Sequence, residues 1–260
     1  MIPAWVGVAV RTGARRVLAE PGGLLMQVFF YLLVTGAVTS LWRVAVEANS
    51  GTVAGYDARA LTWYIALSEG AYMAVNSHLI EEVGDDVAGG AVASEMLRPA
   101  PVVGVRLATQ LGRSLPRLAA NSGAGVLLCL LTVGAPPSTT GVALAAPAML
   151  LAGACNLAAM HGVAALTFWL RDARSSWFLY QKLVFIFGGM LLPLQVLPPW
   201  LHDVSVHLPF MTMAYVPARL ASGHVEPELL LVQLGWLAVL TAFATSAFAA
   251  GERRLQAVGG

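Results

Sequence analysis

The chain has 260 residues, of which 58% are hydrophobic and 11% are charged, with a formal net charge of +1. Soluble domains carry about 25% charged residues, so this composition excludes a water-soluble globular domain and indicates a membrane protein. No cluster of basic residues resembles a nucleic-acid surface, and no nucleic-acid partner is expected. Cys129 and Cys155 lie inside apolar runs and predict packing residues rather than a disulfide.

The N-terminal segment is apolar as far as Val10, and Arg11, Arg15 and Arg16 follow. A secretory signal has its charges before the apolar run, so this order argues against one. We predict that residues 1–23 form a cytoplasmic interfacial region, in which residues 4–19 are an amphipathic helix on the inner membrane face.

Six apolar stretches come near the ~20 residues that a helix needs to cross a bilayer. They cover residues 24–46, 60–80, 115–133, 142–170, 177–197 and 229–250. Ala154, Ala158 and Gly162 form a small-residue stripe in the fourth, which lets two helices approach closely. The sequence therefore predicts an all-α membrane protein with six spans in one transmembrane domain, residues 1–260.

The basic residues predict the orientation of these spans, because cytoplasmic loops carry an excess of Lys and Arg. With both termini inside, only Arg43, Arg59 and Arg219 of the 15 basic residues lie outside. The opposite orientation inverts this ratio. We therefore expect both termini in the cytoplasm.

Residues 81–113 follow the second span and are expected to be a cytoplasmic coupling loop. Its first part is rich in acids and has no base before Arg98. The acids are Glu81, Glu82, Asp85, Asp86 and Glu95. Unpaired acids predict docking onto a basic rim of a partner protein, and the alternative is a merely solvated loop.

The fifth span leads into a broken apolar stretch that contains Pro193, Pro198 and Pro199. Broken backbone is not tolerated in lipid, so residues 198–227 are expected to be a re-entrant or interfacial hairpin on the outer side. Trp200 and Phe210 join the three prolines in the predicted outer cap. The alternative is an ordinary loop that is apolar.

A few polar residues lie inside the predicted spans. Glu69 is expected to share a helical face with Met73 and Asn76 and to line the substrate pathway. The alternative for Glu69 is a structural hydrogen bond to a neighbouring span, for example to Gln27 or His161. Asn156 and His161 are further candidates for the pathway, although hydrogen bonding between helices is the commoner role of such residues.

The sequence contains no motif that predicts nucleotide binding, catalysis or metal binding. The chain has no P-loop motif, so ATP is not expected to bind here through one. The pair Glu81–Glu82 resembles that of intramembrane proteases, but Asp86 stands where these proteases need an Arg. The outer histidines have spacings that fit no standard metal site, so we expect neither a metal site nor a catalytic residue. They are His202, His207 and His224.

Two stretches resemble the membrane subunits of ABC-2-type exporters. One is GGAVASEMLRP at residues 89–99, and the other is FGGMLLPLQVLPPWL at residues 187–201, followed by LPF at residues 208–210. The order of segments along nearly the whole chain is also similar to this family: an amphipathic elbow helix, two spans, a coupling loop and four spans with a re-entrant region. The acids at Asp85 and Asp86 depart from the family, whose members often have a basic residue before the glycine.

The resemblance implies the permease subunit of an ATP-driven exporter in the bacterial plasma membrane. It implies two separate ATPase subunits, which bind ATP and Mg, and a second permease, identical or related. The low charge of the spans favours a hydrophobic or amphipathic substrate such as an antibiotic, with a lipid or glycan as an alternative. An ion-coupled transporter and a membrane scaffold without transport are the other candidate classes, although only one central carboxylate and no internal repeat support the former.

Overall fold

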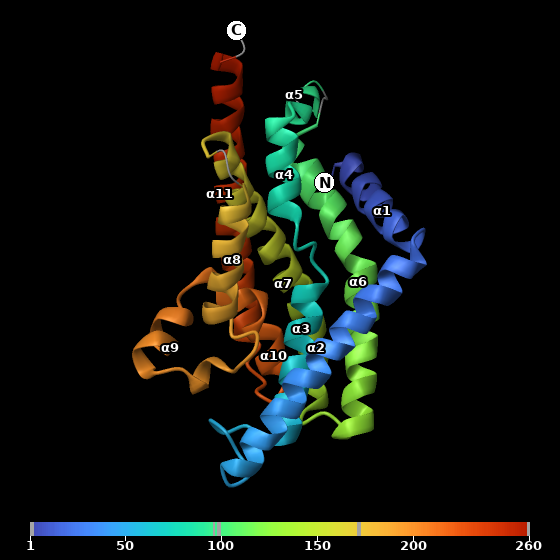
Figure 1. Ribbon diagram of the computed structural model, residues 1–260, viewed down its shortest axis with the longest axis vertical. Helices are drawn as coiled ribbons and strands as arrows, with labels where there is room; N and C mark the ends of the chain where they lie inside the picture. The colour runs from blue at the N-terminus through green and yellow to red at the C-terminus, as the bar shows by residue number, and fades with distance from the viewer. Residues whose placement is uncertain (1–2, 96, 98–99, 171–172, 259–260) are drawn as a thin grey trace.

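The computed structural model describes residues 3–95, 97, 100–170 and 173–258, and this part of the chain is an elongated helical bundle without strands (Figure 1). The α-helices in chain order are α1 (Ala4–Leu18), α2 (Pro21–Ala48), α3 (Ala58–Met73), α4 (Leu79–Ala88), α5 (Ala91–Glu95), α6 (Val102–Thr132), α7 (Thr139–Ala164), α8 (Ala173–Phe187), α9 (Pro199–Ser205), α10 (Tyr215–Ala221) and α11 (Glu228–Val258). Short 3-10 turns are η1 (Ala165–Phe168), η2 (Leu194–Val196) and η3 (Pro209–Met213).

Four of the described helices are long and apolar enough to cross a membrane, namely α2, α6, α7 with η1, and α11. Two other expected spans contain shorter helices, since α3 has 16 residues and α8 has 15. The third span was expected to begin near residue 115, and the helix that contains it, α6, begins earlier, at Val102. Residues 102–113, the second part of the expected coupling region, are therefore helical and continuous with that span.

The second span was expected to run to residue 80, but α3 ends at Met73. The reason is local, because the side chain of Asn76 accepts a hydrogen bond from the backbone N–H of His78 at 3.2 Å. Such an Asn turn competes with helical hydrogen bonding. The chain therefore bends over residues 74–78 before α4 begins, and α3 itself is buried along almost its whole length.

The fifth span also ends earlier than expected, because α8 stops at Phe187 rather than continuing to residue 197. Gly189 follows with φ of +64°, a conformation that glycine adopts without a steric penalty. Side chains of α3 satisfy the carbonyl groups that this break leaves free. Tyr64 donates a hydrogen bond to the Gly189 carbonyl at 2.6 Å, and Ser68 donates one to the Met190 carbonyl at 2.9 Å.

The segment after the break folds back into the bundle. Residues 211–218, in η3 and α10, are buried, and this segment packs against α3 and α7. By contrast α9 projects from the side of the bundle in Figure 1, and Trp200 on it is 68% exposed. The broken apolar stretch therefore has two parts: an exposed α9 and an interior α10.

The N-terminal helix α1 lies beside the N-terminal half of α6 (Figure 1). Two glycines let the backbones touch. A Cβ atom on Gly112 would overlap the carbonyl oxygen of Val10, and one on Gly13 would overlap that of Thr109. The amphipathic helix is therefore packed onto α6 through backbone contact, as small residues allow.

This contact predicts opposite effects for two similar substitutions. Gly112→Ala should destabilise the protein by about 1–3 kcal/mol, because the added methyl group forces α1 away from α6. Gly7→Ala is the matched control, since nothing lies within 4 Å of that position. Alanine in an exposed helix interior is favoured by about 1 kcal/mol over glycine, so this variant should unfold at the same or a higher temperature. Thermal unfolding in detergent measures both, and equal midpoints for the two variants would contradict the contact.

Candidate functional site

A cavity of about 470 Å³ opens between α2 and α8, with α3 and α7 behind it. We call it the Glu69 cavity. Four residues expected in the pathway line it, although they lie on different elements: Glu69, Met73, Asn76 and Asn156. The surface of its lining is mostly apolar. The structure thus brings four of the five expected residues to one place, while His161 lies elsewhere.

The Glu69 side chain is fully buried, and neither of its carboxylate oxygens has a hydrogen-bond partner among the described residues. The two residues that were expected to bond Glu69 form hydrogen bonds with other groups. Gln27 donates to the Met73 carbonyl at 3.0 Å, and the His161 Nδ1 bonds the Leu157 carbonyl at 2.8 Å. The structural hydrogen bond proposed from the sequence is therefore wrong for both partners.

Two other polar residues of the Glu69 cavity are hydrogen-bonded within the protein. Asn156 accepts a hydrogen bond from the Tyr180 hydroxyl at 2.6 Å, which joins α7 to α8. Asn76 donates one to Glu82 at 2.9 Å. Asn76 does not share a helical face with Glu69, because α3 ends before it, but the bend at residues 74–78 still returns it to the cavity.

Side-chain contacts bound the Glu69 cavity at its two ends along the long axis of the bundle. Towards the break after α8, the indole N–H of Trp42 on α2 donates to the Leu191 carbonyl at 2.9 Å. Towards α4, the Trp177 ring stacks on His78 with 6.1 Å between the ring centres. The cavity is therefore bounded by the bundle at its ends and open between α2 and α8.

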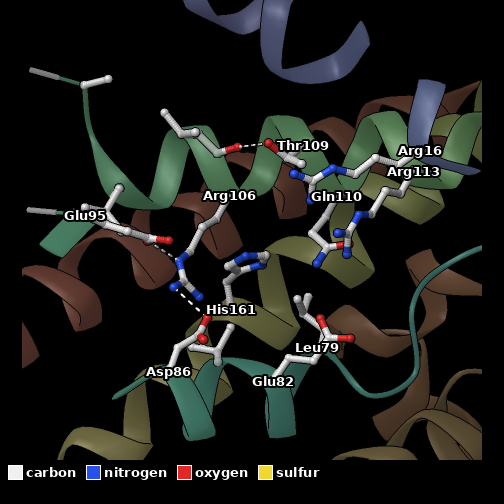
Figure 2. A pocket seen from close by; sticks show the side chains of 14 residues that line it. Arg16, Leu79, Glu82, Asp86, Glu95, Arg106, Thr109, Gln110, Arg113 and His161 are labelled. Atoms are coloured by element: carbon white, nitrogen blue, oxygen red, sulfur yellow. Dashed lines mark hydrogen bonds and ion pairs between the residues drawn. The ribbon is translucent and has the colours of Figure 1, made fainter. Parts of the chain in front are cut away.

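A second cavity of about 320 Å³ lies between α4 and α6 (Figure 2). We call it the α4–α6 cavity. His161 lines it together with Arg16, Glu82, Gln110 and Arg113. The Nε2 atom of His161 and the Oε1 atom of Gln110 are buried without a hydrogen-bond partner in the described part of the chain. His161 is therefore part of a polar site beside α4 and not part of the Glu69 cavity.

One arginine joins the acidic segment to α6. Arg106 donates hydrogen bonds to Asp86 at 2.8 Å and to Glu95 at 2.7 Å, and its side chain is only 13% exposed (Figure 2). The expectation of five acids without a base is thus wrong for two of them, since the base comes from α6. Bonds of this kind fix α4 and α5 to α6.

The remaining residues of the predicted coupling site differ in exposure. Glu81 is half-buried and lies 3.0 Å from His78, while Glu82 and Asp85 are exposed. Arg98 lies outside the described residues. The acids still available to a partner are therefore Glu81, Glu82 and Asp85.

The predicted outer cap is not one surface. Pro193 is buried and Phe210 stacks on Phe187 at 6.3 Å, whereas Pro198 and Pro199 are exposed with Trp200 on and beside α9. No group of three metal-binding side chains in the described residues can hold a metal ion.

An ion pair joins α10 to the segment that precedes α11. Arg219 on α10 donates to Glu226 at 2.7 Å and to the Tyr56 hydroxyl at 2.9 Å. The hydrogen bond from Arg219 holds the pKa of Glu226 below its ordinary value, and burial lowers the pKa of His224. Because Glu226 has a depressed pKa, its contribution to stability is present above the ordinary value and is lost as the pH falls.

Sequence reasoning missed the aromatic wall of the Glu69 cavity and the role of Arg106. Trp177, Tyr180 and Phe185 line the cavity from α8. Their helical spacing was a usable signal, since at 3.6 residues per turn the three positions fall within an arc of about 140° on a helical wheel. The pairing of Arg106 had no local signal, because its partners are 11 and 20 residues away.

Removing this arginine should release α5. Arg106→Gln leaves Asp86 and Glu95 without their ion-pair partner, so we expect a loss of about 1–3 kcal/mol in stability and faster proteolysis near residues 89–97. Arg113→Gln is the matched control, because Arg113 has no ion pair among the described residues. Limited proteolysis of the purified protein compares the two. Equal cleavage rates in both variants would show that Arg106 does not hold α5.

Comparison with known proteins identifies the family of the chain. A model of the ABC-2 family transporter proteins matches residues 30–259. A search of curated proteins gives no match. The family pairs with an ABC ATPase. Since the match covers most of the chain, the protein belongs to the ABC-2 family of transporter proteins and is a membrane permease of that kind.

Proposed function

We propose that the chain is the permease subunit of an exporter that moves a hydrophobic or amphipathic small molecule out of the cell. The observation that carries this proposal is the acid-bearing α4–α5 element, fixed to α6 by Arg106. Such a rigid element at one end of the bundle suits the transfer of force from a partner ATPase. ATP and Mg are bound on that partner in this proposal, and the permease supplies the pathway.

The connection between α4 and the Glu69 cavity supports a coupled mechanism. The bend at residues 74–78 joins α4 directly to α3, and Asn76 in the bend bonds Glu82 on α4. Displacing α4 therefore also displaces a lining residue of the cavity. Binding of ATP on the partner can in this way change the shape of the substrate site.

The number of subunits follows from the same proposal. A second permease, identical or related, completes the pathway, and two ATPase subunits dock on the two α4–α5 elements. Exposed apolar side chains along α2, such as Leu25, Phe29 and Leu33, suit contact with lipid or with the second permease. The helix α1, the last turns of α11 and α4–α5 lie towards one end of the bundle in Figure 1, which supports termini on the cytoplasmic side of a bacterial plasma membrane.

An ion-coupled transporter is the second candidate, because a buried carboxyl without a partner is typical of proton relays in membranes. Export of a lipid or glycan by the ATP-driven mechanism is a variant of the first. Proteoliposomes that contain the permease and its ATPase separate these classes. Uptake into inside-out vesicles should require hydrolysable ATP and persist when ionophores dissipate ion gradients. Transport that needs a gradient and not ATP would overturn the proposal.

Reversing the charge of acids of α4 that do not pair with Arg106 should break the coupling. Glu81→Lys with Asp85→Lys changes one face of α4, on which Asp85 is exposed and Glu81 is half-buried beside His78, and it leaves the Arg106 pairs intact. We expect the ATPase to dissociate, or its hydrolysis to lose stimulation by substrate, because the basic rim of the partner is now repelled. The control is Glu47→Lys on the last turn of α2, which is exposed and far from α4 in sequence. Normal co-purification and transport in the α4 variant would show that docking uses another surface.

Labelling with a membrane-impermeant thiol reagent tests the orientation. Cysteines at Trp200 and Asp203 on α9, with 68% and 77% exposure, should react in intact cells. Cysteine at Ala88 on α4 is the control and should react only after permeabilisation. The native Cys129 and Cys155 are buried and contribute little background. Labelling of Ala88→Cys but not of the α9 variants in intact cells would invert the proposed topology.

A further inference from the structure

The Glu69 cavity contains a carboxyl group that the rest of the chain does not use. The side chain is fully buried, lines the cavity, and has two oxygens without a hydrogen-bond partner in the described residues. Leaving a buried polar group without a partner is costly, and a buried charge is costlier still. A partner that comes from outside the chain removes this cost, and it has to supply a donor or a positive charge.

The charge of the lining points to a cation rather than an anion. Glu69 is the one ionisable carboxyl among the described residues that line the cavity, and no Arg, Lys or His lines it. The amides do not compete for it. Asn156 is bonded to Tyr180, Gln27 to the Met73 carbonyl and Asn76 to Glu82, and neither Glu69 oxygen accepts a hydrogen bond from any lining amide. The cavity therefore presents a single negative site, which matches a ligand with a single positive charge.

The walls suit the apolar part of such a ligand. Phe30, Tyr72, Trp177 and Phe185 supply aromatic rings from three helices, and Tyr72 meets Phe185 edge to face at 5.9 Å. Aromatic faces attract cations and cover apolar surface at the same time.

Methionines complete the lining, and they favour binding of ligands of varied shape over recognition of a single shape. Met73, Met160 and Met190 come from different elements. Their flexible thioethers adapt to irregular ligands, as in other promiscuous binding surfaces. The volume of about 470 Å³ falls within the range of small-molecule sites.

We propose that the Glu69 cavity binds an amphipathic monocation, a protonated amine attached to an aromatic or apolar body, with Glu69 as the partner of the ammonium group. This names the substrate class of the proposed exporter and rests on that function for its physiological meaning. Binding itself needs neither ATP nor the ATPase.

Equilibrium binding to the purified full-length chain in nanodiscs tests the proposal. The probe is a fluorescent naphthylalkylamine, and the matching alcohol and carboxylate serve as neutral and anionic probes of the same shape. The amine should bind at least ~10-fold more tightly than the alcohol, and the carboxylate should bind most weakly. Glu69→Gln should weaken the amine about tenfold, equivalent to about 1.4 kcal/mol, while the alcohol changes little.

Glu47→Gln is the matched control, because it removes an exposed acid at the end of α2 and should leave all three affinities unchanged. Phe185→Leu should weaken the amine and the alcohol together. The selectivity of the wild-type chain tests the proposal even where Glu69→Gln fails to assemble. Equal affinity for amine and alcohol, or an amine affinity unaffected by Glu69→Gln, would overturn it. ATP-driven transport of another substrate class would then still be open, so the two proposals can fail separately.

Discussion

Carbonyl groups freed inside an apolar bundle need donors, and this requirement organises the protein. The chain breaks after α8, and the freed carbonyls of Gly189 and Met190 accept hydrogen bonds from Tyr64 and Ser68 on α3. Without these donors the break would leave unsatisfied backbone away from water, which costs several kcal/mol per group in lipid. With them, α8 can end early, the chain can return through α10, and the Glu69 cavity acquires a closed end.

The helix α3 thus has two roles that its sequence combines in sixteen residues. Tyr64 and Ser68 supply donors to the segment that follows α8, and Glu69, the residue after Ser68, lines the cavity. Because α3 is buried on nearly all sides, we expect it to move as a rigid helix, so that a displacement of one end also displaces the other. The proposed link from α4 to the substrate site runs through this helix and the bend that follows it.

The composition and the apolar runs predicted the helical membrane class and located most helices, because hydrophobic length is a direct consequence of the bilayer. Helix ends were predicted less well where tertiary contacts decide them. The stop at Met73 depends on an Asn turn, and the stop at Phe187 depends on donors from α3. Neither is visible in hydropathy. Glu69 and Asn156 were found as polar residues in apolar runs, whereas Arg106 needed the fold to show its partners.

The backbone contact between α1 and α6 has a mechanical consequence. Because Gly13 and Gly112 leave no side chain between the two helices, α1 cannot slide independently of α6. Arg106 on α6 is in turn held by α4 and α5. A push on α5 would therefore be passed through Arg106 to α6, and through the glycine contact from α6 to α1, so that these helices move as one body.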